Sequence, residues 1–392
     1  MKCVIIGAGK IARGFLGHLL YLSNIPFTFV EKNRELVNLM NERGEYTVNI
    51  LGDNTKNCVV KNVKAVCLED EENVIELIGQ GDLVFTSIGG KNLETIVPIL
   101  AKGIEKRLEN PGYLNIITCE NWKQPALLLE KGVEEVISGW KKEDLKRVGF
   151  SEAVIMRSGI EAEEELRKRD PLIVNVQNYW KLPIDGSRIK GTLPEIIGVE
   201  LLQEFTGFLE RKFYTYNAAN GTTSYLGALL GYQYISDAAF DERILKILEG
   251  VYLETAKALS LKHGIPLQEQ LDFTLTSKRK LQDVTIVDYI ERNARDPLRK
   301  LGKDDRLVGS ARMVMEQGIK PENLAIAIAA AIHYKSPQDE FAEKLEKMRK
   351  EEGIDYILEN VCEIKPEEEL AILIKEKINL LQQWGWIKKN EE

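Results

Sequence analysis

The stretch KCVIIGAGKIARGF, residues 2–15, decides the fold. Residues 2–6 are an apolar run with β-branched side chains, which predicts a buried strand, and the apolar residues that follow recur at helical spacing. Between them lies the pattern Gly7-x-Gly9-x-x-Ala12. Its first glycine permits a tight turn, its second lets a pyrophosphate approach the backbone, and its small third residue brings the helix close to the sheet. Strand, glycine turn and helix in this order predict a dinucleotide-binding site.

An acidic residue supports this interpretation. Glu31 ends a second predicted strand, residues 26–30, about 20 residues beyond the glycine turn. A carboxylate there accepts hydrogen bonds from the adenosine ribose hydroxyls and repels a 2′-phosphate, which favours NAD over NADP. Lys32 could nevertheless tolerate the extra phosphate, and a structural glycine turn without a ligand is the alternative. The residues expected to contact the cofactor here are Gly7, Ala8, Gly9, Lys10, Ile11 and Glu31.

Strands and helices alternate through the first half of the chain. Further strands are predicted at 83–88 and 114–118, with helical stretches near 34–43, 92–108 and 124–138. This alternation indicates a parallel, doubly wound sheet. Beyond the turn-rich stretch 182–192, strand signals nearly vanish and helical periodicity dominates. The predicted fold is therefore α/β, with a Rossmann-type parallel-sheet domain at 1–190 and a mainly α-helical domain at 191–392.

Two predicted loops follow strands at the carboxyl edge of this sheet, where open α/β folds bind their ligands. Gly89 lies in the loop Gly-Gly-Lys after one strand, and Asn121 ends Cys-Glu-Asn after the next. We expect both residues at the cofactor site. Ordinary loop turns remain an equally good interpretation of each segment alone.

Composition excludes several classes of protein. With 392 residues, 44% hydrophobic and 29% charged, the chain is too long for a small binding module. It has no apolar run of the roughly 18 residues that would cross a membrane. A formal charge of −8 argues against nucleic acid as a partner, so any anionic ligand must be met by local cations.

Cysteine and histidine usage points to a protein without metal or disulfides. The five cysteines are scattered without a CxxC pair, and the three histidines are not at ligand spacing. The chain opens directly on its first strand, with no secretory signal pattern. We expect a metal-independent protein of the reducing cytoplasm.

A second candidate site lies in the helical half. On a regular helix with Lys212 at zero, Asn220 falls at about 80° and Asn217 at about 140°, so the three side chains share one flank. A desolvated lysine can lose its proton near neutral pH and act as a base for an alcohol, while an amide can donate to the developing alkoxide. The alternative is a solvated surface lysine beside Arg211.

With these residues in view, the chain resembles the polyol-specific long-chain dehydrogenases over nearly its whole length. Lys212 and Asn217 match the family signature of Lys, four residues, Asn, two residues, His, whereas Asn220 stands in place of the histidine. Met156 stands where many members carry an aspartate. The stretches that carry the resemblance are IIGAGKIARGF (5–15), LNIITCEN (114–121), DPLIVNVQNYW (170–180), KFYTYNAANGTTSYLG (212–227) and RDPLRKLGKDDRL (295–307).

The resemblance implies a metal-independent, NAD-dependent oxidation of a secondary alcohol, or the reverse reaction. Lys212 would take the hydroxyl proton, Asn217 and Asn220 would stabilise the oxyanion, and Asn121 would orient substrate or nicotinamide. Met156 would lie at the substrate. No metal, nucleic acid or membrane is implied, and an oligomer is possible.

A basic run near residue 300 completes the expected substrate site. It comprises Arg292, Arg295, Arg299, Lys300 and Arg306. Guanidinium groups bind phosphate or carboxylate through paired hydrogen bonds, but ion pairs with Asp296, Asp304 and Asp305 are an equally good explanation of any one residue. The resemblance favours Arg295 and Arg299 as substrate contacts.

The chain is similar to the shorter, sugar-phosphate branch of the family. The expected substrates are therefore a sugar-alcohol phosphate and a ketose phosphate, of the mannitol 1-phosphate and fructose 6-phosphate type. The changes at Met156 and Asn220 leave two alternatives open. One is a reductase of a uronate or a free ketose, and the other is an NAD-binding protein without catalysis.

Overall fold

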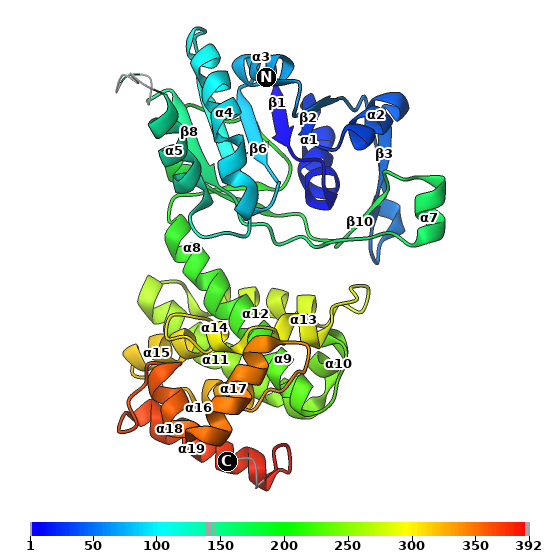
Figure 1. Cartoon of the computed structure of the whole chain (residues 1–392). Coiled ribbons are helices and arrows are strands. Elements are labelled where there is room, and N and C mark those ends of the chain that lie inside the picture. Colours follow the sequence, from blue (N-terminus) through cyan, green and yellow to red (C-terminus); the bar gives the residue numbers. More distant parts are fainter. Residues whose placement is uncertain (1, 138–142, 144–145, 389–392) are drawn as a thin grey trace. The chain divides into compact units, whose positions relative to one another are not determined.

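The protein, seen here in a computed structural model, is described over residues 2–137, 143 and 146–388. It forms two compact units, Met1–Phe205 and Thr206–Glu392 (Figure 1). The predicted boundary at residue 190 falls between two strands that pair in parallel, β11 (Leu182–Asp185) and β12 (Val199–Leu202). Because of this pairing, β12 stays with the first unit.

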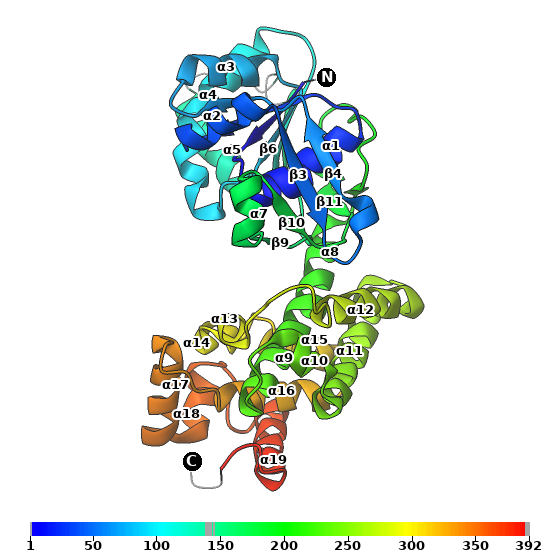
Figure 2. The same cartoon turned by 90° about the vertical axis from the view of Figure 1, so that its right-hand side faces the viewer.

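A six-stranded parallel sheet forms the centre of the first unit (Figure 2). Its order is β5-β2-β1-β6-β7-β8, so the chain fills one side of β1 first and then the other. Successive residues of β1 face opposite cores, with Cys3 and Ile5 in one and Val4 and Ile6 in the other. The six strands are β1 (Cys3–Ile6), β2 (Phe27–Glu31), β5 (Ala65–Cys67), β6 (Leu83–Thr86), β7 (Leu114–Thr118) and β8 (Val148–Glu152).

Helices cover both faces of this sheet. The core containing Ile5 takes apolar side chains from η1, α1 and α2, and the core containing Val4 takes them from α3, α4 and α5. The side chain of Asn33 caps α2 by accepting hydrogen bonds from two backbone amides of its first turn, and Gly44 ends the helix in a left-handed conformation. The bounds are η1 (Ala12–Gly17), α1 (His18–Leu22), α2 (Arg34–Arg43), α3 (Glu71–Gln80), α4 (Leu93–Leu108) and α5 (Pro125–Val136).

The first unit also contains a four-stranded sheet in the order β4-β3-β10-β9. Nothing in the predicted alternation of strands and helices accounts for it. Strand β3 pairs antiparallel with β4 and parallel with β10, which lies far along the chain. The remaining elements of the unit are β3 (Glu45–Ile50), β4 (Cys58–Lys61), β9 (Gly159–Ile160), α7 (Glu164–Arg169), β10 (Val174–Val176), and the short turns η2 (Asn54–Lys56), η3 (Gly90–Asn92) and η4 (Gly186–Arg188).

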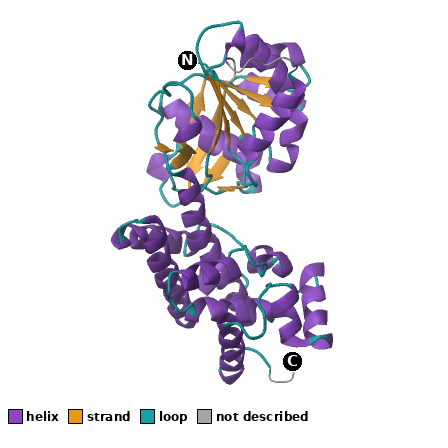
Figure 3. Cartoon of the chain, turned by 90° about the vertical axis from the view of Figure 1, so that its left-hand side faces the viewer, coloured by secondary structure: helices purple, strands orange, loops and turns teal. Residues whose placement is uncertain are grey.

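Helices joined by loops make up the described part of the second unit (Figure 3). This arrangement and the parallel sheet confirm the predicted fold class. No helix within the described ranges has both the length and the apolarity that crossing a membrane would require. The helices are α8 (Phe205–Lys212), η5 (Phe213–Asn217), α9 (Ala218–Leu229), α10 (Ile235–Phe240), α11 (Glu242–His263), α12 (Leu267–Leu281), α13 (Ile290–Ala294), α14 (Pro297–Lys300), α15 (Val308–Glu316), α16 (Glu322–Ile332), α17 (Glu340–Glu351), α18 (Gly353–Asn360) and α19 (Glu369–Gln383).

Helix α16 lies at the centre of this unit. Every residue from Leu324 to Ile332 is buried, and the helix packs against α9, α11, α15, α17 and α19. Five of these residues are alanines, whose small side chains let neighbouring helices approach closely. The apolar stripe of α19, including Leu373 and Ile374, is buried in the same core, so this helix packs against the rest of the unit.

We expect Ile374→Ala to lower the free energy of unfolding by about 3 kcal/mol, because it leaves a cavity at a fully buried position. Ile372→Ala removes the same atoms from a side chain that is 52% exposed and should cost less than about 1 kcal/mol. Chemical denaturation of both variants measures the difference. Equal losses would contradict the packing of α19 described above.

Candidate functional site

The glycine turn lies where the strand order reverses between β1 and β6. Gly7 has a φ of +102°, and its amide donates to Val30 O at 2.7 Å. A Cβ at this position would lie 2.3 Å from Ser87 O, the carbonyl that follows β6, so no side chain fits. Open α/β sheets bind their ligands at such a reversal. Gly7 therefore brings the ends of two strands together at the expected ligand edge.

The second glycine leaves open space where the first leaves none. A Cβ on Gly9 would meet no atom within 4 Å, as the close approach of a pyrophosphate to the backbone requires. Ala12 is fully buried at the start of η1 and lets this helix pack on the sheet. Lys10 is half exposed and its ammonium lies 2.9 Å from a carboxylate oxygen of Glu161, while Ile11 is half-buried.

Glu31 ends β2 beside the glycine turn. One carboxylate oxygen accepts from the amide of Ala8 at 2.8 Å, and the other accepts from the amide of Asn33 at 3.0 Å. These two bonds fix the orientation of the carboxylate. Each oxygen has a further lone pair, so a ribose hydroxyl can still donate to it.

Arg13, which the sequence patterns do not single out, holds the glycine turn through the backbone carbonyl of Ala8. Its Nε donates to Ala8 O at 2.8 Å, and one terminal nitrogen donates to Leu172 O at 2.6 Å. Burial lowers the pKa of this guanidinium. Its carbonyl accepts from the hydroxyl of Tyr46 at 2.8 Å, so the turn is joined to the second sheet as well.

Arg157 is a second buried guanidinium in this unit. It lies over the rings of Phe15 and Trp180, 4.9 and 4.5 Å from their centres. Its nitrogens donate to Gly14 O at 2.9 Å and to Tyr179 O at 2.5 Å. Burial lowers the pKa of Arg157 to about 10. The segment after β8 is thereby joined to η1.

Met156 lies just before Arg157, in the loop after β8. Its side chain is 2% exposed, and its sulfur accepts a hydrogen bond from the hydroxyl of Tyr179 at 3.3 Å. Burial raises the pKa of Tyr179 to about 12, so the phenol keeps the proton that it donates. The substrate role of Met156 stays a prediction, and in the first unit this side chain presents very little surface.

Glu120 organises the neighbouring loops. Its two carboxylate oxygens accept from the amides of Ile88 and Gly89 at 2.8 and 2.9 Å, which joins the loop after β6 to the loop after β7. Gly89 has a φ of +83°. Asn121 is exposed beside Glu120. The two segments expected at the cofactor site thus do lie together, and Glu120 is the residue that unites them.

In the second unit, Lys212 precedes a π-helical turn and Asn217 ends it. Lys212 ends α8, η5 follows, and the amide of Ala218 reaches the carbonyl of Phe213, five residues back. Because such a turn holds one residue more than an α turn, Asn217 takes the position of a fourth residue and Asn220 that of a seventh. Measured from Lys212, Asn217 then lies at about 40° and Asn220 at about −20°, instead of the expected 140° and 80°. The three residues share a face more closely than a regular helix allows.

Side chains from α12 hold this turn in place. Gln270 is fully buried and donates to the Thr215 hydroxyl at 3.0 Å, while its carbonyl oxygen accepts from Arg211 Nε at 2.6 Å. The Arg211 guanidinium lies 4.4 Å from the centre of the Phe273 ring. Arg211 is therefore a structural part of the helix junction and not a solvated companion of Lys212.

The Lys212 ammonium lies among other cations. Burial, followed by the charge of Arg306, lowers the pKa of Lys212. Lys280 of α12 is close enough that burial and the charge of Lys212 lower its own pKa to about 8. The Cδ of Arg306 lies 3.3 Å from where a Cβ of Gly221 would be, and its guanidinium lies 5.9 Å from the centre of the Phe213 ring. A neutral amine is thus favoured at Lys212 by its surroundings.

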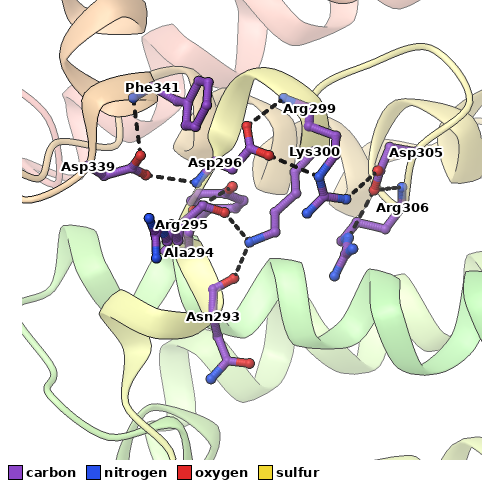
Figure 4. Close-up of polar contacts among 11 residues, drawn as sticks. Asn293, Ala294, Arg295, Asp296, Arg299, Lys300, Asp305, Arg306, Asp339 and Phe341 are labelled. Carbon is purple, nitrogen blue, oxygen red and sulfur yellow. Dashed lines mark hydrogen bonds and ion pairs between the residues drawn. The ribbon is translucent and has the colours of Figure 1, made fainter. Parts of the chain in front are cut away.

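Figure 4 shows how Arg299, Lys300 and Arg306 of the basic run are paired. Arg299 contacts Asp296 at 2.9 Å and Asp305 at 3.1 Å, so the ion-pair alternative applies to it, whereas Arg295 is exposed. Lys300 is buried and its ammonium donates to the carbonyls of Asn293, at 2.6 Å, and Arg295. Burial and then the charges of Arg306 and Arg299 lower the pKa of Lys300 to about 8.

Arg306 is the member of the run that lies with Lys212. Its Nε donates to Asp305 at 2.9 Å, and its two terminal nitrogens have no hydrogen bond to any other described residue. Its proximity to Lys212, and not the sequence pattern, distinguishes Arg306 from Arg299. Over residues 2–137, 143 and 146–388, no group of three or more His, Cys, Asp and Glu side chains is placed to hold a metal ion.

Comparisons with known proteins cover both units. Residues 1–198 match the family model of the mannitol dehydrogenase Rossmann domain, and residues 204–382 match that of the mannitol dehydrogenase C-terminal domain. Mannitol 2-dehydrogenase of Pseudomonas fluorescens, solved as a ternary complex with NAD and D-mannitol, is similar with a TM-score of 0.68 at 16% identity, over 98% of this chain and 92% of that one. A D-sorbitol dehydrogenase in substrate-free form has a TM-score of 0.79 at 14% identity, over 98% and 93%. At these identities the two structures show a shared fold.

Gly7 and Gly9 should respond in opposite ways to the same substitution. Gly7→Ala should lower the free energy of unfolding by about 3 kcal/mol, because the methyl group meets Ser87 O in a backbone conformation that disfavours a side chain. Gly9→Ala should stay within about 1 kcal/mol of the wild type, because its methyl group enters open space. Chemical denaturation tests the pair, and a wild-type stability of Gly7→Ala would refute the close contact.

Proposed function

Because the chain belongs to the mannitol dehydrogenase family over both units, we propose that it is an NAD-dependent polyol dehydrogenase with Lys212 as general base. The single observation that carries the proposal is the π-helical turn, which places Asn217 and Lys212 on one face among cations that favour a neutral amine. The NAD of the Pseudomonas fluorescens complex supports the choice of cofactor.

The first unit suits a dinucleotide at the glycine turn. Open space before Gly9 leaves room for a pyrophosphate, and the oriented carboxylate of Glu31 can accept from ribose hydroxyls. Lys10 and Ile11 would flank the pyrophosphate, with Gly89 and Asn121 beside the nicotinamide. When bound, NAD supplies the hydride acceptor for the alcohol carbon.

The residues of the second unit supply proton transfer and charge stabilisation. Neutral Lys212 takes the hydroxyl proton of the substrate, and the amide of Asn217 donates to the oxygen as negative charge develops on it. The C–O bond becomes a carbonyl as the C–H bond breaks. In the reverse direction, the Lys212 ammonium returns the proton.

We further propose a phosphorylated substrate, of the mannitol 1-phosphate and fructose 6-phosphate type handled by mannitol-1-phosphate 5-dehydrogenases. In a chain of net charge −8, Lys280, Lys300 and Arg306 concentrate positive charge near Lys212. The terminal nitrogens of Arg306 can bind phosphate oxygens in pairs, and exposed Arg295 could add a contact. Arg299 would act through Asp305, which it shares with Arg306.

A free polyol is the second candidate, favoured by the D-mannitol complex and the D-sorbitol dehydrogenase among the similar structures. Measuring NADH consumption with fructose 6-phosphate, fructose and fructuronate distinguishes the phosphorylated, free and uronate substrates. Preference for fructose would overturn the phosphate proposal, and preference for fructuronate would point to a uronate reductase. Tight NADH binding without turnover of any ketose would indicate a protein without catalysis.

Lys212→Met should lower kcat at least about a thousandfold, because the general base is lost. NADH binding, followed by fluorescence, should be unchanged. The matched control is Lys246→Met, which alters an exposed lysine of the same unit and should keep wild-type kcat. A Lys212→Met variant with full activity would refute the mechanism.

Arg306→Gln should shift the pH dependence of polyol oxidation to higher pH. A positive neighbour lowers the pKa of an ammonium group, so its removal raises the pKa of Lys212 towards its ordinary value, and a smaller fraction is neutral at any given pH. The pH profile of kcat measures the shift. Arg279→Gln, an exposed residue of α12, serves as control, and an unshifted profile for Arg306→Gln would contradict the assigned electrostatics.

A further inference from the structure

A chain of three polar side chains runs from an acid to the catalytic face of α9. Asn220 of α9 donates through Nδ2 to Oδ1 of Asn293 at 3.0 Å, and Asn293 of α13 donates through Nδ2 to Oδ1 of Asp288 at 2.6 Å. All three side chains are partly buried. Asn293 is further held by its carbonyl, which accepts from the Lys300 ammonium at 2.6 Å.

The donors and acceptors in this series of hydrogen bonds fit together in one orientation only. The Nδ2 of Asn293 faces two groups that can only accept, the Asp288 carboxylate and, at 2.9 Å, the carbonyl of Tyr289. Both N–H bonds of this amide are therefore used, and its Oδ1 must be the atom that meets Asn220. Because that oxygen can only accept, Asn220 must present its Nδ2 to it.

The orientation of Asn220 follows. The nitrogen and oxygen of an amide lie on opposite sides of the carbon that carries them, so Oδ1 of Asn220 faces away from Asn293. Reversing the amide would place two oxygens against each other and leave a partly buried donor and acceptor unpaired, at the cost of a lost hydrogen bond. Since the chain ends on a carboxylate, its hydrogen bonds are strengthened by charge.

Resting on the dehydrogenase function above, we propose that Asp288 and Asn293 are positioning residues that fix Asn220 as a hydrogen-bond acceptor for a substrate hydroxyl. An acceptor cannot stabilise an oxyanion, so that task falls to Asn217 alone. The expectation that Asn220 shares it is replaced by a role in recognising a hydroxyl group. Because these hydrogen bonds form without the substrate, the acceptor orientation of Asn220 is set before any substrate binds.

A double-mutant cycle tests whether Asp288 and Asn293 act through Asn220. The variants are Asn220→Ala, Asn293→Ala, Asp288→Asn and the double variant Asn220→Ala/Asn293→Ala. For each, kcat/KM is measured with NADH and D-fructose 6-phosphate, or with D-fructose if it is the better substrate. We expect losses of about tenfold for Asn220→Ala and about fivefold for Asn293→Ala and Asp288→Asn, with the double variant no worse than Asn220→Ala.

Asp288→Asn keeps the size of the side chain but allows the side-chain amide of Asn293 to flip. It therefore tests the donor and acceptor orientation of Asn220 without deleting a side chain. The matched control is Asn323→Ala, because Asn323 Nδ2 also donates to a carboxylate of this unit, Glu254, at 2.7 Å. It should lower the melting temperature while leaving kcat/KM within twofold of the wild type.

Each outcome decides one of the two proposals. A wild-type protein without turnover would overturn the dehydrogenase function and this inference with it. An active wild type with unchanged kcat/KM in Asp288→Asn and Asn293→Ala would overturn the inference alone. So would losses that add in the double variant, because they would show that Asn293 acts independently of Asn220.

Discussion

The site in the second unit depends on one constraint, the additional residue held by the π-helical turn between α8 and α9. On a regular helix the side chains five and eight residues after Lys212 would share only a broad flank with it, at about 140° and 80°, and the turn brings all three onto a narrower face. The fully buried Gln270 holds the turn by bonding Thr215 on one side and Arg211 on the other. The arrangement of Lys212 and Asn217 is thus part of the packing between α12 and the helix junction, and does not depend on a mobile loop.

Gathering cations at this place has an energetic consequence. Burial, and then the neighbouring cations, lower the pKa values of Lys280 and Lys300 to about 8, so between about pH 8 and the ordinary lysine value the folded state binds fewer protons than the unfolded state. The penalty is present in full below that window and fades as the pH rises through it. A bound anion would relieve the part of this penalty that comes from repulsion between the cations, which ties stability to ligand binding. The tightly packed core around α16 offsets this local cost.

Local patterns in the sequence were sufficient for some features and not for others. The glycine turn and Glu31 follow from spacing within one strand, turn, helix and second strand, and the fold class follows from the alternation of elements. The sheet that joins β3 to β10 depends on pairing between distant segments, which no local pattern contains. Arg306 could not be told from Arg299 by sequence, because only the path of the chain over α9 decides which of them lies near Lys212. The π-helical turn could not be predicted from the sequence either, because residues 213–217 contain no glycine or proline that would mark a break in a regular helix.

Two buried arginines anchor the glycine turn of the first unit and the helix that follows it. Arg13 and Arg157 attach them to surrounding segments through the carbonyls of Ala8, Leu172, Gly14 and Tyr179. Dissolved ions weaken an exposed ion pair but act far less on a buried bond to a neutral oxygen, and a carbonyl does not titrate. These four hydrogen bonds should therefore hold equally well in dilute buffer and in concentrated salt, for as long as the unit stays folded.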